Sequence, residues 1–113
     1  NSMETTMLID ESDPRYEGYR KHKEEHGWSP CELWSLDTTI AQFILPRLKG
    51  LRKNSGGFPG SFSTFEEWEA ILDKMIVSFE WHASDDKYLT AKEPDGIQEG
   101  LDLFAKYFGA LWY

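Results

Sequence analysis

The sequence predicts an all-α domain, a small helical bundle, from three observations. Apolar residues recur at spacings of three and four in three separate segments, which is the period of one helix face. Capping residues, glycine or proline bound each of these segments. No run of β-branched residues alternating with polar ones predicts a strand. We expect main helices at about 36–53, 64–83 and 95–112, and one or two accessory helices at about 14–26 and 30–35.

Capping residues predict the two accessory helices near the N-terminus. Asp13 and Pro14 supply an N-cap side chain followed by a proline at the first helical position. Gly27 ends the highly charged segment that follows. Ser29 and Glu32 have the spacing of a capping box, which starts the second accessory helix.

The length of 113 residues corresponds to one domain, and we assign residues 14–113 to it. A chain of this size can bury one core without a disulfide, and the single Cys31 cannot form an internal one. Residues 1–13 are mostly polar, so we expect a flexible arm that begins with an expression scar at Asn1 and Ser2. The lone cysteine, and the lack of the roughly 18-residue apolar run that a membrane span needs, predict a cytoplasmic protein without membrane contact.

The first main helix carries a proline inside its apolar pattern. Proline lacks a backbone N–H and clashes with the carbonyl four residues earlier, which costs roughly 3 kcal/mol within a helix. The sequence leaves open whether Pro46 kinks one helix or separates two. Thr38, Thr39 and other polar residues are assigned to the side away from the apolar stripe. The apolar residues at helical spacing are Leu36, Ile40, Phe43, Ile44, Leu48 and Leu51.

The second main helix has the clearest apolar period in the chain. A loop rich in glycine and proline precedes it at 54–62, and Ser63 or Thr64 then supplies an N-cap with a glutamate three residues later. Residues 84–96 are polar and connect it to the last helix. The stripe of the second helix comprises Phe65, Trp68, Ile71, Leu72, Met75, Ile76 and Phe79, and that of the last comprises Ile97, Leu101, Phe104, Phe108 and Leu111.

The formal net charge of −8 restricts the class of partner. A net negative protein repels phosphates, and four clustered cations are too few for a nucleic-acid footprint, which argues against direct binding of nucleic acid. An acidic surface can instead face a basic groove of another protein. The helix dipole accounts for the clustered cations at a helix C-terminus. These cations are Arg47, Lys49, Arg52 and Lys53.

Two predicted helices carry residue types that can serve metal binding or acid–base chemistry. His22 and His26 stand four residues apart, as two metal ligands on one helix face do, but no third ligand follows at a known spacing. A solvated polar surface explains these residues and the carboxylates of the second main helix more simply. We therefore predict no cofactor, metal ligand or catalytic residue. The carboxylates that share one face of that helix are Glu66, Glu69, Asp73 and Glu80.

Five tryptophans are a large number for a chain of this length. Trp68 lies in an apolar stripe and is assigned to the core. The other four are candidate partner contacts, because large aromatic side chains dominate the binding energy of many protein interfaces. They are Trp28, Trp34, Trp81 and Trp112.

Three blocks of the sequence occur in the same order as in one protein family. They contain Trp34-Ser-Leu-Asp37 with Phe43-Ile-Leu-Pro-Arg-Leu48, then Glu67-Trp68 with Ile71-Leu-Asp-Lys-Met-Ile76, and finally Gly100-Leu-Asp-Leu-Phe-Ala-Lys-Tyr-Phe108. Around 34–48, 67–80 and 100–112 the chain thus resembles a family of short uncharacterised proteins of tailed bacteriophages and prophages. The resemblance implies a phage accessory protein made in the cytoplasm of a bacterial host, and it implies no particular activity.

Three hypotheses about function follow. The first is a small acidic, non-enzymatic protein that binds and modulates a host or phage protein, because the chain is short and aromatic-rich and carries no catalytic constellation. The second is a self-assembling or virion-associated structural component, since apolar stripes on several helices could pack against further copies. The third is a metal-dependent enzyme that uses the acidic helix at 64–83.

Overall fold

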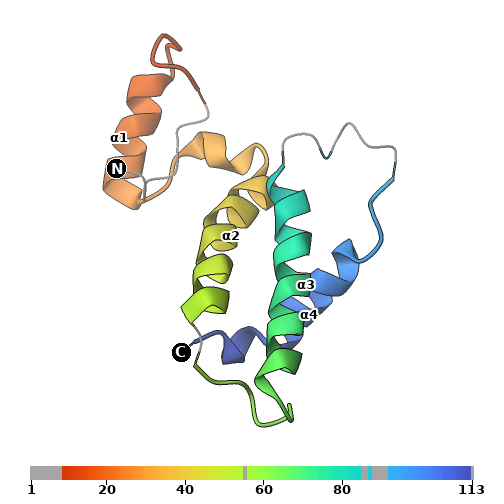
Figure 1. Cartoon of the computed structure of the whole chain (residues 1–113). Helices are drawn as coiled ribbons and strands as arrows, with labels where there is room; N and C mark the ends of the chain where they lie inside the picture. Colours follow the sequence, from red (N-terminus) through yellow and green to blue (C-terminus); the bar gives the residue numbers. More distant parts are fainter. Residues whose placement is uncertain (1–8, 55, 85–86, 88–91, 113) are drawn as a thin grey trace.

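A computed structural model describes residues 9–54, 56–84, 87 and 92–112, which form helices joined by turns and loops (Figure 1). These ranges contain no strand, so the all-α prediction is confirmed. The label η marks a short 3-10 helix. The elements are α1 (Tyr16–His26), η1 (Pro30–Leu33), α2 (Leu36–Asn54), α3 (Phe65–Ala83), α4 (Ile97–Lys106) and η3 (Phe108–Ala110).

Capping residues set several helix boundaries where the sequence places them. Thr64 is the N-cap of α3: its hydroxyl accepts the N–H of Glu67 at 3.2 Å, and the Glu67 carboxylate accepts the N–H of Thr64 at 3.0 Å. The Glu32 carboxylate likewise accepts the N–H of Ser29 at 2.9 Å, so the predicted capping box of η1 forms. Gly27 ends α1 with a φ of 85°, a left-handed conformation that glycine adopts without steric cost.

Other predicted boundaries are wrong. α1 begins at Tyr16 rather than 14, because Asp13 Oδ1 accepts the backbone N–H of Arg15 at 2.8 Å and closes a turn ahead of the helix. η1 is a single 3-10 turn that stops at Leu33 rather than 35. α4 stops at Lys106 rather than 112, because the backbone leaves the helical region at Tyr107, with φ −107° and ψ 19°.

The predicted N-terminal arm at 1–13 lies largely outside the described residues, which begin at residue 9. The expression scar expected at Asn1 and Ser2 falls in the same undescribed part. Of the arm, the described end is a turn in which the N–H of Asp13 donates to the carbonyl of Asp10 at 2.9 Å.

α2 continues through Pro46 as one helix, which answers the question that the sequence leaves open. Pro46 has no N–H to donate to the carbonyl of Gln42. The Arg47 guanidinium donates to the carbonyl of Phe43 at 2.7 Å and so adds a donor beside the missing bond. The side chain of Gln42 donates to the carbonyl of Ala83 at 3.3 Å, which ties α2 to the end of α3.

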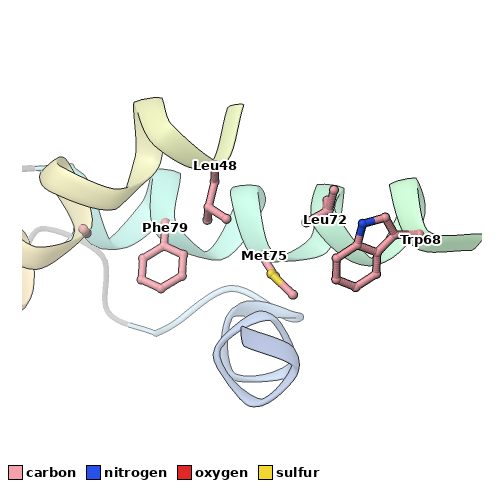
Figure 2. Packing of buried hydrophobic residues seen from close by; sticks show 6 residues of the cluster. Leu48, Trp68, Leu72, Met75 and Phe79 are labelled. Carbon is pink, nitrogen blue, oxygen red and sulfur yellow. The ribbon is translucent and has the colours of Figure 1, made fainter. Parts of the chain in front are cut away.

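α3 is the central helix, because α2 and α4 both pack against it. Figure 2 shows its side chains as a row between the two neighbouring helices, with Trp68 at one end and Phe79 towards the other. Leu72 and Met75 in this row are completely buried, as the apolar period of this segment predicts. The buried core cluster comprises Ala41, Leu48, Trp68, Leu72, Met75 and Phe79.

The contact between α3 and α4 is close enough to require glycine. A Cβ at Gly100 would lie 2.4 Å from the Cβ of Ser78 and 2.5 Å from the carbonyl oxygen of Lys74. The buried Ser78 hydroxyl of α3 donates to the carbonyl of Ile97, at the start of α4, at 2.7 Å and so has a hydrogen-bond partner.

α1 and η1 stand to one side of the three packed helices (Figure 1). α1 has no buried residue and packs chiefly on η1. A partly buried ion pair joins the two elements, with Lys23 Nζ 3.2 Å from Glu32 Oε2.

The apolar prediction for α2 is wrong along its N-terminal half. Leu36, Ile40 and Phe43 are exposed, whereas Thr38 and Ala41 are buried against the rest of the protein. Thr38 can be buried because its hydroxyl has a partner, the Nζ of Lys87 at 2.7 Å.

Candidate interaction surface

An exposed apolar stripe begins in η1 and runs along α2. Leu33, Leu36, Ile40 and Phe43 leave 55%, 47%, 52% and 55% of their surface exposed. The last three lie in α2 at spacings of four and three, which places them on one helix face, and Leu33 precedes them in η1. We call these four residues the outer stripe.

The outer stripe lies opposite the face of α2 that packs on α3. The buried positions Thr38, Ala41 and Leu48 define the inner face. Thr38 is two residues from both Leu36 and Ile40, which in an α-helix is about 200° around the axis. α2 is therefore apolar on two opposite sides, and within the described residues only one of them is covered by a neighbouring helix.

A cation borders the C-terminal end of the outer stripe. The guanidinium carbon of Arg47 lies 3.8 Å from the centre of the Phe43 ring, within cation–π range. No carboxylate of the described residues pairs with Arg47, whereas its neighbours Lys49 and Arg52 pair with acids of α3. Arg47 thus holds the Phe43 ring in place and keeps donors available at the surface.

The outer stripe is large enough to contribute to a protein interface. With Trp34, which is 52% exposed, five half-exposed side chains expose on the order of 500 Å² of apolar surface, taking roughly 200 Å² for each. Contiguous patches of about 300–600 Å² on monomeric proteins are frequently functional. Standard interfaces bury about 800 Å² per partner, so this stripe could form the apolar centre of one.

The structure places the four predicted tryptophan contacts against different neighbours, and two of them pack on α1. Trp34, in the turn between η1 and α2, packs its edge on Tyr19 with the ring centres 6.3 Å apart. Trp28 is 41% exposed and contacts His22, and Trp81 is partly buried beside His82. Trp112 is 75% exposed beyond η3, near the C-terminal end of α2. By position in the chain, Trp34 is the one next to the outer stripe.

The two candidate histidines are neighbours, as their spacing predicts. The ring centres of His22 and His26 are 4.4 Å apart, and His22 Nδ1 lies 2.8 Å from the carbonyl oxygen of Trp28. In the described part of the chain, no group of three or more His, Cys, Asp or Glu residues could hold a metal ion. The contact joins His22 of α1 to Trp28 in the turn that follows the helix.

The carboxylates of α3 mostly form ion pairs with cations of α2. Arg52 lies between Asp73 and Glu69, with N–O distances of 2.9 and 2.8 Å, and the Asp73 hydrogen bond raises the pKa of Arg52. Glu80 Oε2 lies 3.2 Å from Lys49 Nζ. The acids and bases that the sequence presents as separate clusters therefore meet along the seam between the two helices.

Lys87 forms a buried polar centre that the sequence does not reveal. Its side chain is 2% exposed, and its ammonium lies 2.7 Å from Thr38 Oγ1, 2.6 Å from the His82 carbonyl and 2.9 Å from Asp37 Oδ2. Burial, followed by the nearby Lys87 charge, lowers the pKa of His82 below its usual value. The three oxygens match the three donors of an ammonium, so Lys87 fastens the segment after α3 to the start of α2.

No protein-family model, curated protein or solved structure matches this chain. Among the described residues, no helix has the length and apolar character needed to cross a bilayer.

Proposed function

We propose that this chain is a small non-enzymatic binding protein whose outer stripe docks an amphipathic helix of a partner protein. The observation that carries the proposal is the outer stripe itself. Three of its half-exposed apolar residues lie at helical spacing opposite the core face of α2, and Leu33 of η1 precedes them. Alternating spacings of four and three, as in Leu36, Ile40 and Phe43, form the seam along which two helices pack their side chains into one another. A helix is therefore the partner element that this surface fits best.

The charge of the chain favours a basic partner over a second copy. The net charge of −8 attracts a basic helix at long range, and it opposes association of two identical chains. From the sequence resemblance to tailed-phage proteins, we further propose that this partner is a phage or host protein in the bacterial cytoplasm. The α2–α3–α4 bundle then serves as the scaffold that holds α2 rigid.

A synthetic probe helix tests the proposal directly. The probe is a leucine–lysine peptide with leucines at spacings of three and four, and its matched control carries glutamate in place of lysine. We expect the lysine peptide to bind and the glutamate peptide to bind at least about tenfold more weakly, because a charge mismatch suppresses wrong partners. Fluorescence anisotropy of a labelled peptide measures both affinities.

Matched variants locate the binding surface. Ile40→Ser with Phe43→Ser should weaken the lysine peptide more than about tenfold, because it removes two apolar anchors. Val77→Ser is the control, since Val77 is 52% exposed on α3 and lies outside the outer stripe. Equal binding by the double variant and the wild type would refute the proposal.

Self-assembly through the same face is the second candidate function, because these spacings of four and three also suit identical helices. Light scattering at micromolar concentration separates the two. A monomer mass near 13.1 kDa agrees with docking of a different partner. A dimer that the Ile40→Ser, Phe43→Ser double variant abolishes would instead establish self-assembly.

A further inference from the structure

A hollow of about 420 Å³ lies where the C-terminal end of α2, the following loop and the C-terminal segment meet. This volume falls within the roughly 300–1,000 Å³ range of small-molecule sites. The hollow is at the other end of α2 from most of the outer stripe, and it does not depend on the proposed helix docking. Its lining residues are Asn54, Gly56, Gly57, Phe58, Pro59, Trp68, Ala110 and Trp112.

Trp68 is fixed in orientation at one wall of this hollow. It is 2% exposed, and its ring centre lies 5.6 Å from that of Phe62 and 5.7 Å from that of Tyr107. The Phe62 and Tyr107 rings also contact each other, with centres 5.3 Å apart. Three mutually packed rings leave the indole little freedom to turn.

The indole N–H of Trp68 is a donor without a protein acceptor. None of the described residues accepts a hydrogen bond from it. The nitrogen is also not fully buried. Among the described residues, the fully buried side-chain nitrogen or oxygen without a hydrogen-bond partner is His82 Nε2. Trp68 is one of the residues that line the hollow, and the site proposed below has its N–H facing the hollow.

The walls define the chemistry of an occupant. Phe58, Pro59 and Trp112 offer apolar and aromatic surface, and none of the described lining residues has a charged side chain. A buried charge without an ionic partner is disfavoured, which favours an uncharged occupant over a carboxylate or an ammonium at this wall. A planar apolar body with an uncharged acceptor satisfies both the rings and the indole N–H.

We propose that this hollow binds an uncharged aromatic ligand that carries a carbonyl acceptor. The carbonyl accepts the Nε1–H of Trp68, and the ring packs between Phe58 and Trp112. Trp112, expected from the sequence to contact a protein partner, thereby becomes a wall of a small-molecule site. The ring pair of Phe62 and Tyr107 acts only through Trp68, by holding its N–H edge towards the ligand.

Two probes with the same ring system test the site: naphthylacetamide, which is uncharged, and naphthylacetate, which is not. Nitrogen-15 NMR resolves the indole N–H of each tryptophan, and the Trp68 signal is the one missing in Trp68→Phe. We expect naphthylacetamide to shift that signal saturably and to bind at least about fivefold more tightly than naphthylacetate. Trp68→Phe should weaken naphthylacetamide by about three- to tenfold, the usual value of one hydrogen bond.

Control variants decide the interpretation. Trp81→Phe removes an indole N–H elsewhere and should leave the affinity unchanged, while Trp112→Ala should weaken binding even if Trp68→Phe proves unable to fold. The proposal is overturned if millimolar naphthylacetamide leaves the Trp68 signal in place, or if Trp68→Phe folds and binds equally well. A preference for naphthylacetate that Arg47→Gln removes would also overturn it, because Arg47 lines a neighbouring hollow of about 550 Å³.

Discussion

α2 and α3 are both 19 residues long and both carry apolar residues at helical spacing, yet they differ in how many sides are covered. α3 packs against α2 and α4, and its stripe is buried or partly buried. α2 packs on α3 along one face and leaves the outer stripe exposed on the other. Periodicity thus shows that a helix has an apolar face, whereas the number of neighbours decides which face is buried.

Truncation in the two helices should show the largest contrast. Leu72→Ala in α3 removes a side chain with no exposed surface and should lower the free energy of unfolding by about 2–5 kcal/mol. Ile40→Ala in α2 removes a side chain that is 52% exposed and should change it by less than about 1 kcal/mol. Urea unfolding followed by circular dichroism measures both. Similar losses for the two variants would mean that the outer stripe is covered in solution.

The boundaries and stripe of α3 could be predicted because their causes are local. Thr64 and Glu67 cap the helix within four residues of each other, and the apolar positions repeat without interruption. The burial of Thr38 could not be predicted, because its partner Lys87 is 49 residues away in the sequence. Long-range pairing of this kind leaves no local signal.

Only part of the candidate site can be predicted from the sequence. The sequence predicts that Leu36, Ile40 and Phe43 share one stripe, but their exposure depends on α3 packing against the opposite face. A second stripe through Ala41, Leu45 and Leu48 was present and could have signalled a helix with two apolar faces. The early end of α4 also involves residues distant in the sequence, since the ring of Tyr107 packs against the rings of Phe62 and Trp68.

Glycine substitutions compare a helix position that contacts a neighbouring helix with one that does not. Gly100→Ala in α4 would place a Cβ 2.5 Å from the Lys74 carbonyl of α3, and separating the helices should cost about 1–3 kcal/mol. Gly50→Ala in α2 meets no atom within 4 Å, and a better helix former there should stabilise the protein by up to about 1 kcal/mol. Melting temperatures should move in opposite directions, and a stabilising Gly100→Ala would contradict the close α3–α4 contact.

Lys87 tests how the inner face of α2 is fixed at its start. Lys87→Met keeps much of the side-chain volume but leaves the buried Thr38 hydroxyl and the His82 carbonyl without this donor. We expect a loss of about 1–2 kcal/mol in unfolding free energy. Lys49→Met removes the exposed pair with Glu80 and should cost less than about 0.5 kcal/mol. If both variants lost equal stability in urea titrations, the buried network would have no special role.

The pH dependence of His82 is the smallest expected effect and reports on the same end of the helix pair. Burial, and then the Lys87 charge, lowers the pKa of His82 in the folded protein below the 6.5 of an unperturbed histidine. Between the folded pKa and 6.5 the unfolded chain binds more protons, so stability falls as the pH decreases through that window. The melting temperature should therefore drop by roughly 1–3 °C between pH 7 and pH 5.5 on account of this group. His82→Gln should remove this part of the drop, whereas His26→Gln, at an exposed position of α1, should retain it. An unchanged slope in His82→Gln would show that the ring is as well solvated in the folded protein as in the unfolded chain.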